Sequence, residues 1–143
     1  MAFYGGDKMG ISYVFVLAAA IAVFVNVMNY KVSMDAMKEL PENKEKVQSR
    51  FFLILALSEI IPIILIVYGF SNLETVSAME ELYMPGLLVI VLIGFAALFI
   101  VLQRIVGVPK DMKAFAKNFS NIAMATTMSI PIIAIIAMYT MIP

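Results

Sequence analysis

The amino-acid composition alone indicates the broad class of this protein. Of its 143 residues, 63% are hydrophobic and only 14% are charged, whereas about a quarter of the residues of an ordinary soluble domain are charged. The formal net charge is zero, which argues against a basic surface for nucleic acid. Cysteine and histidine are absent, which excludes disulfides, thiolate chemistry and the commonest metal ligand and general base. We therefore expect an integral membrane protein without a metal or other cofactor.

Four long stretches that are poor in charge predict four transmembrane helices. The stretches are bounded by charged residues: Lys8 and Lys31, Arg50 and Glu74, Glu81 and Arg104, and Lys117 before the last. Each is long enough to cross about 30 Å of hydrocarbon, which takes about 20 helical residues. Four buried helices of a soluble protein are the alternative, but the chain has too little polar sequence to cover them. The expected helices are residues 9–32, 50–72, 83–107 and 116–142.

The basic residues predict the orientation in the membrane. Nine of the ten fall in two connections: Lys31, Lys38, Lys44, Lys46 and Arg50, and then Arg104, Lys110, Lys113 and Lys117. The connection between the second and third helices carries only acidic charge. By the positive-inside rule, both basic connections are cytoplasmic and both termini lie outside, in a bacterial or archaeal plasma membrane. We expect no removable signal peptide, because a basic segment followed by a cleavage site is missing.

A short motif occurs twice in the chain, once in each half. Ile61-Pro62-Ile63-Ile64 matches Ile130-Pro131-Ile132-Ile133. Ser58 then corresponds to Thr127, and Glu59 corresponds to Met128. We therefore expect two tandem helical hairpins of the same orientation, residues 1–72 and a degenerate second copy, residues 73–143. A chance match of a common residue type is the alternative.

Glu59 is the candidate functional residue because it is the one charge deep inside a predicted span. It follows Arg50 by nine residues and precedes Glu74 by fifteen, which places it about 13 Å and about 22 Å from the two edges. An ionised group at that depth costs at least about 2.5–3.5 kcal/mol. No Lys or Arg lies at comparable depth, so Glu59 is either protonated much of the time or paired with a cation of another protein.

Pro62 bears on the same site, because it lacks an N–H and leaves the Ser58 carbonyl without its helical donor. In lipid that carbonyl needs a partner, such as the protonated Glu59 carboxyl or a water. Alternatively, Pro62 merely bends a packed helix and Glu59 donates one fixed hydrogen bond.

Ala18, Ala20 and Ala22 predict close helix packing, unless they reflect ordinary alanine content. The polar first half of the fourth helix either hydrates a site or joins helices.

The segment from Pro41-Glu42 to Pro62 resembles the c subunit of rotary ATP synthases. Members of that family have a polar loop ending in Gln-Pro-Asp or Gln-Pro-Glu, one carboxylate in the helix after it, and often a proline three residues beyond. The spacing from Pro41 to Glu59 is similar to that of the family, and Pro62 follows Glu59 by three. Glu39-Leu40 replaces the family's Arg-Gln before the proline. Fused double hairpins with one carboxylate are known in the vacuolar, archaeal and some bacterial forms.

The resemblance implies that Glu59, with Ser58 and Pro62 beside it, carries an ion around a ring of identical subunits. It implies that the Pro41-Glu42 loop contacts the central stalk, and that Ala18, Ala20 and Ala22 form an inner-helix face. A stator subunit would place an arginine opposite Glu59, with lipid around the ring. Thr127 and Met128 would be the degenerate second site. Sodium-binding members have a Ser or Thr directly after the carboxylate and a glutamine in an inner helix. Ile60 and a first span without glutamine therefore predict protons.

Two other functions stay open. One is a small four-helix exporter of cationic drugs that works as a dimer, with Glu59 as the shared proton and substrate site. The usual carboxylate in the first helix and the tryptophan-containing aromatic cage are missing here. The other is an accessory subunit of a respiratory complex, in which a partner buries Glu59. None of the three functions gives the chain a catalytic site of its own.

Overall fold

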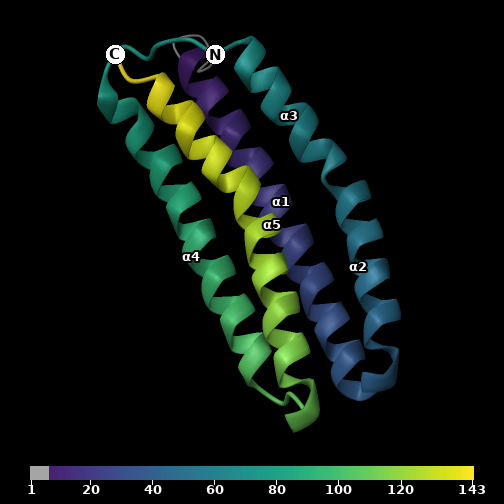
Figure 1. Ribbon diagram of the computed structural model, residues 1–143. Coiled ribbons are helices and arrows are strands. Elements are labelled where there is room, and N and C mark those ends of the chain that lie inside the picture. Colours follow the sequence, from purple (N-terminus) through teal and green to yellow (C-terminus); the bar gives the residue numbers. More distant parts are fainter. Residues whose placement is uncertain (1–6) are drawn as a thin grey trace.

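The computed structural model describes residues 7–143, with side chains from Gly10 onward. Its long helices are α1 (Asp7–Glu39), α2 (Lys44–Ser58), α3 (Ile60–Ser71), α4 (Tyr83–Ile105) and α5 (Lys113–Thr140). Three short 3-10 turns connect them: η1 (Pro41–Asn43), η2 (Met79–Leu82) and η3 (Lys110–Met112). The described part of the chain therefore contains four rods, one of which is made of α2 and α3 end to end (Figure 1).

The four rods confirm the expectation of four helices that are long and apolar enough to cross a membrane. They comprise residues Gly10–Glu39, Pro41–Ser71, Met79–Ile105 and Lys110–Thr140. The 33 residues of α1 extend about 50 Å, well beyond the hydrocarbon thickness. The helix ends with the charges therefore project from the apolar layer.

The connections are shorter than the sequence suggested. The expected break from Lys31 to Arg50 is mostly helical, and only Leu40 and the turn η1 separate α1 from α2. The residues there are good helix formers such as Lys, Met, Ala and Glu. An ion pair of 2.9 Å between Lys31 and Asp35, one turn apart, also supports the helix. Pro41 ends α1 because the residue before a proline disfavours the helical conformation.

The helices α1 and α5 form the centre of the molecule. In their most apolar stretches 44% of the residues are buried, against 22% in the α2–α3 rod and in α4. The α2–α3 rod packs against α1, and α4 packs against both α1 and α5. In Figure 1 the order across the molecule is α2–α3, α1, α5 and α4. The two flanking rods therefore keep wide apolar faces uncovered.

In the described residues the core has two large packed regions at opposite ends of the bundle and a smaller one between them, around Val23, Val27 and Ala96. Near the start of α1, Phe15 and three alanines pack against α3, α4 and α5. Gly69 allows the closest approach there, because a Cβ at this position would lie 2.6 Å from the Phe15 ring. At the other end, Tyr30 stacks on Phe119 with ring centroids 5.6 Å apart and donates a hydrogen bond to the Ile100 carbonyl. The stacked rings join α1 to α5, and the hydrogen bond joins α1 to α4.

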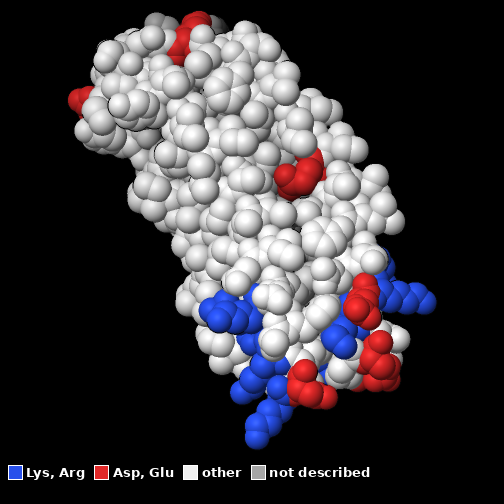
Figure 2. All heavy atoms as spheres, in the orientation of Figure 1, with Lys and Arg blue, Asp and Glu red and all other residues white. Residues whose placement is uncertain are grey.

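The charged residues gather at the two ends of the bundle. Figure 2 shows Lys and Arg at the end that holds the α1–α2 and α4–α5 connections. On the same face, the opposite end shows only acidic residues. At that end the backbone N–H of Val76 donates to the Met141 carbonyl (2.9 Å), which fastens the connection after α3 to the end of α5.

Candidate functional site

Glu59 lies at a break between two helices. The helix α2 ends at Ser58 and α3 begins at Ile60, so the expected single helix over residues 50–72 is interrupted at the carboxylate. The Glu59 N–H donates to the Leu55 carbonyl and its own carbonyl accepts from Ile63, both at 3.0 Å. Pro62 cannot donate to the Ser58 carbonyl that lies between these two bonds. The break thus coincides with one missing helical hydrogen bond, and Figure 1 shows it halfway along the rod.

The partner of Glu59 is a carboxamide on the neighbouring helix. Nδ2 of Asn26, in α1, donates to Oε1 of Glu59 at 3.0 Å. Asn26 is 1% exposed, whereas Glu59 is only partly buried. The carboxyl is therefore held against α1 on one side and open on the other.

No cation touches this carboxyl among the residues that the structure describes. The one ion pair in that part of the chain joins Lys31 and Asp35. On the face drawn in Figure 2, acidic atoms also appear midway along the molecule, away from both of its charged ends. Among the described residues, the partner of the Glu59 carboxyl is therefore the neutral Asn26 and not a cation.

The geometry of the pair suits both protonation states of the carboxyl. Asn26 donates through Nδ2, while its buried Oδ1 has no hydrogen-bond partner within the described residues. An ionised carboxylate can only accept, but a protonated carboxyl can also donate. Gaining a proton would therefore let Glu59 supply the donor that Oδ1 lacks. A buried acceptor without a partner costs about 1–3 kcal/mol. The protonated carboxyl would remove that cost, while the ionised carboxylate accepts the bond from Nδ2.

The other residues of the predicted site lie around this pair or apart from it. The Ser58 hydroxyl donates back to the Leu55 carbonyl at 3.0 Å, within its own helix, and not to Glu59. Pro62 is buried. Pro41 and Glu42 belong to the turn η1 at the basic end of the bundle, where Glu42 is exposed and Pro41 is half-buried. The carboxyl site itself therefore consists of Glu59 and Asn26, at the break that precedes Pro62.

The three alanines of α1 do not share one face. Ala18 and Ala22 are buried in the core together with Ala19, whereas Ala20 is only partly buried. Residues two apart point to nearly opposite sides of a helix, while residues four apart align. The close-packed surface of α1 is therefore made by Ala18, Ala19 and Ala22.

The second half of the chain carries an apolar counterpart of the site. Met128 packs against Val23 and Val27 of α1 and Ala96 of α4. Thr127 is fully buried, and its hydroxyl has no hydrogen-bond partner in the described part of the chain. Pro131 lies inside α5 without interrupting it. A proline alone therefore does not break a helix in this molecule, and the surroundings of Pro62 must contribute to the break at Glu59.

Asn26 is the functional residue that the sequence reasoning missed, although a signal was present. The antiparallel course of α1 and the α2–α3 rod turns near Glu42. Asn26 precedes Glu42 by nearly the same number of residues as Glu59 follows it. Helices of equal rise that turn at one point place such residues at equal depth. A polar residue opposite the carboxylate could therefore have been found by counting from the turn.

No protein-family model, curated protein or solved structure matches this chain. The class of protein follows from the fold itself. Four apolar rods with charges at their ends make the chain a multi-pass helical membrane protein.

Proposed function

We propose that this chain is the proton-carrying rotor subunit of a rotary ATP synthase or ATPase. The observation that carries the proposal is the state of Glu59: a carboxyl at mid-span, unpaired with any described cation, held by one carboxamide and partly open. Ionisable groups at such depth are expensive and generally functional. A fixed structural role would favour a carboxyl enclosed on all sides.

The internal repeat supports assembly into a ring. Met128 of α5 lies against both α1 and α4. The repeat makes Glu59 the counterpart of Met128, and Glu59 lies against α1 alone through Asn26. In a closed ring the α4 helix of a neighbouring copy would complete the groove beside α1. The uncovered faces of α4 and of the α2–α3 rod are what such neighbours would bury.

In this proposal each copy carries one proton on Glu59 as the ring turns within the lipid. A stator subunit would present an arginine, which favours the ionised carboxyl and draws off the proton. The turn Pro41–Asn43 would face the central stalk. One carboxyl per four helices moves fewer ions per turn than an equally wide ring of single hairpins. This ratio favours ATP-driven pumping, or synthesis under a large ion-motive force.

Two other functions remain as alternatives. A dimeric exporter of cationic drugs would use Glu59 for both proton and substrate, and the open side of the carboxyl is compatible with it. An accessory subunit of a respiratory complex would have Glu59 covered by a partner. The number of copies in the assembly separates the exporter from the rotor. The effect of Glu59→Gln on coupled transport separates the accessory subunit from both.

The first test is labelling with dicyclohexylcarbodiimide, which attacks protonated carboxyls in apolar surroundings. We expect selective modification of Glu59 that fades as pH rises and that added sodium does not inhibit. Glu59→Gln should abolish labelling, and Glu74→Gln, at the acidic end, serves as the matched control. The modified peptide is identified by mass spectrometry. Absence of labelling at every pH where the protein stays folded would reject a proton carrier, and protection by sodium would assign a sodium carrier instead.

The second test measures the assembly. Native mass spectrometry of the full chain, extracted in mild detergent, should show one closed species of many copies. A dimer as the largest species would favour the exporter. A species containing one copy with other polypeptides would favour the accessory subunit.

A further inference from the structure

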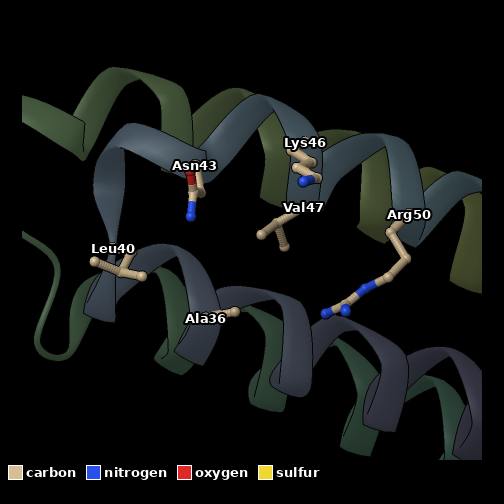
Figure 3. A pocket seen from close by; sticks show the side chains of 6 residues that line it. All are labelled: Ala36, Leu40, Asn43, Lys46, Val47 and Arg50. Atoms are coloured by element: carbon tan, nitrogen blue, oxygen red, sulfur yellow. The ribbon is translucent and has the colours of Figure 1, made fainter.

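A basic cavity lies between α1 and α2 at the charged end of the bundle. Its volume is about 350 Å³. Figure 3 shows its six lining residues: Ala36 in α1, Leu40 directly after α1, Asn43 in the turn η1, and Lys46, Val47 and Arg50 on α2. The Arg50 side chain reaches from α2 toward α1 (Figure 3). The cavity thus has an apolar floor and two cationic groups at its rim.

Neither cation is satisfied by the protein itself. In the part of the chain that the structure describes, Lys46 and Arg50 make no ion pair and no hydrogen bond, and the one ion pair involves Lys31 and Asp35. Lys44, by contrast, lies over the Phe115 ring at 5.6 Å from its centroid. Two positive groups beside one cavity, both without a counter-ion, suit an anionic ligand such as a phosphate.

An apolar groove lies along the same two helices, nearer the middle of the membrane. The groove, of about 450 Å³, is lined by Phe24, Val25, Met28, Asn29 and Val32 of α1 and Ile54 of α2. On α1 the lining of groove and cavity follows one stripe of every fourth residue, because such residues share a helix face: Phe24, Met28, Val32, Ala36 and Leu40. Phe24, Met28 and Val32 are 54%, 59% and 55% exposed.

The depth of the two parts fits a phospholipid. Arg50 lies about 13 Å and Lys46 about 20 Å from the level of Glu59 along the helix. The hydrocarbon of a bilayer ends about 15 Å from its middle. The two cations therefore straddle the level where headgroup phosphates begin. The groove lies deeper, at the level of the acyl chains.

We propose that the α1–α2 seam binds one anionic phospholipid, with its phosphate between Lys46 and Arg50 and an acyl chain along Phe24, Met28 and Val32. The charge of the cavity selects an anionic over a zwitterionic headgroup. The groove distinguishes a lipid from a soluble phosphate, because only a lipid occupies both parts of the seam. The site does not use the Glu59 carboxyl. In the proposed ring it requires the neighbouring α4 to leave the seam at Phe24, Met28 and Val32 uncovered.

The test is native mass spectrometry of the full chain with dioleoylphosphatidylglycerol as the probe and dioleoylphosphatidylcholine as the zwitterionic reference. We expect a preference for the anionic lipid. The double variant Lys46→Gln/Arg50→Gln should bind that lipid about 30-fold more weakly, at roughly fivefold for each lost charge near the surface. Lys110→Gln/Lys113→Gln, in the other basic connection, carries the same change of net charge and should leave binding unchanged. Circular dichroism checks that the helices persist.

A second variant tests the acyl groove separately. Val32→Phe should fill the groove and weaken binding of the dioleoyl lipid several-fold. Inorganic phosphate at millimolar concentration should not displace the lipid from either protein. Three outcomes would overturn the proposal. The first is an equal loss of anionic-lipid binding in the two charge variants. The second is displacement of the lipid by millimolar inorganic phosphate. The third is a disulfide-linked dimer of Val32→Cys that forms whether or not lipid is added. The last would show that a second copy of the chain covers the seam.

Discussion

The Glu59 carboxyl accepts a hydrogen bond from one neutral neighbour, the Asn26 carboxamide. This bond bears directly on the protonation of Glu59. A carboxamide is both donor and acceptor, so it can remain bonded while the carboxyl gains or loses a proton. A lysine or arginine in its place would hold the carboxyl ionised. The choice of an amide therefore matches a group that changes its protonation state.

Asn26→Leu tests this hydrogen bond. Because Nδ2 donates to Glu59, its loss should favour the protonated carboxyl and move the half-maximal pH of carbodiimide labelling upward. A hydrogen bond to a charged group is worth about 1.5–3 kcal/mol, which is large enough for the upward shift to be measured.

The control for that shift is Asn29→Leu, one turn away on the same helix. Asn29 donates to the Phe51 carbonyl and leaves Glu59 untouched, so its labelling profile should not move. A downward shift in Asn26→Leu would mean that Asn26 mainly accepts the proton of Glu59 through Oδ1.

Gly69 supports a second prediction at the scale of a single residue. Gly69→Ala places a methyl group against the buried Phe15 ring, 2.6 Å away without relaxation. Overpacking of this kind costs about 1–3 kcal/mol. We expect a lower temperature of thermal unfolding in detergent, followed by circular dichroism. Gly94→Ala, which has open space around the new methyl group, should not lower it.

At the scale of helices, the break at Glu59 depends on more than Pro62. Pro62 and Pro131 each remove one hydrogen bond, yet α5 continues through Pro131 while α2 and α3 are separate. Thr127 and Pro131 are enclosed by the core, whereas the residues around Glu59 are largely exposed. Packing from several sides can keep a proline-containing helix such as α5 continuous. The α2–α3 rod packs mainly against α1, and this contact does not keep it continuous at Glu59.

Pro62→Ala should therefore restore a continuous helix through Glu59. The Ser58 carbonyl would regain its donor, and amide hydrogen exchange of the peptide that spans residues 57–63 should slow. Pro131→Ala should have a smaller effect on the peptide around Thr127, because α5 is already continuous there. Hydrogen exchange with mass spectrometry of the protein in lipid nanodiscs measures both. Unchanged exchange around Glu59 would mean that another feature causes the break.

How far the sequence predicts these elements depends on the kind of signal. Charges such as Lys31 and Glu81 bracket the spans, because an unpaired charge in lipid is expensive. They do not reveal where a helix ends in water, and α1 accordingly runs on to Glu39. The break at Glu59 also escaped prediction, since Pro62 and Pro131 look alike in the sequence. Their difference comes from tertiary packing, which no local pattern encodes.

The candidate site was predicted in part for the same reason. Glu59 is conspicuous because a charge in an apolar span needs an explanation. Asn26 is an uncharged residue in a helix with other polar residues. It is recognised as a site residue only once its contact with Glu59 is known. Ser58, adjacent to Glu59 in the sequence, bonds to its own helix. Neighbours in sequence were thus a poorer guide than equal depth in the bilayer.

At the scale of the whole molecule, the separation of charge predicts an orientation. The connections α1–α2 and α4–α5 carry the basic residues and are expected in the cytoplasm. The chain has no cysteine, so single cysteines can be introduced freely. In intact cells an impermeant maleimide should label Glu80→Cys directly and Lys110→Cys only after permeabilisation. The reverse pattern would invert the topology and place the proposed stalk-facing turn outside.

The central position of α1 has a consequence for biosynthesis. One face of α1 meets the α2–α3 rod, which the ribosome makes next. Tyr30, on another face, contacts Ile100 of α4 and Phe119 of α5, which are made later. Until those helices emerge, its hydroxyl lies unsatisfied in lipid, where the lack of a partner is expensive. A half-made chain therefore holds a polar group without a partner in lipid, until α4 supplies the Ile100 carbonyl and α5 covers the ring with Phe119.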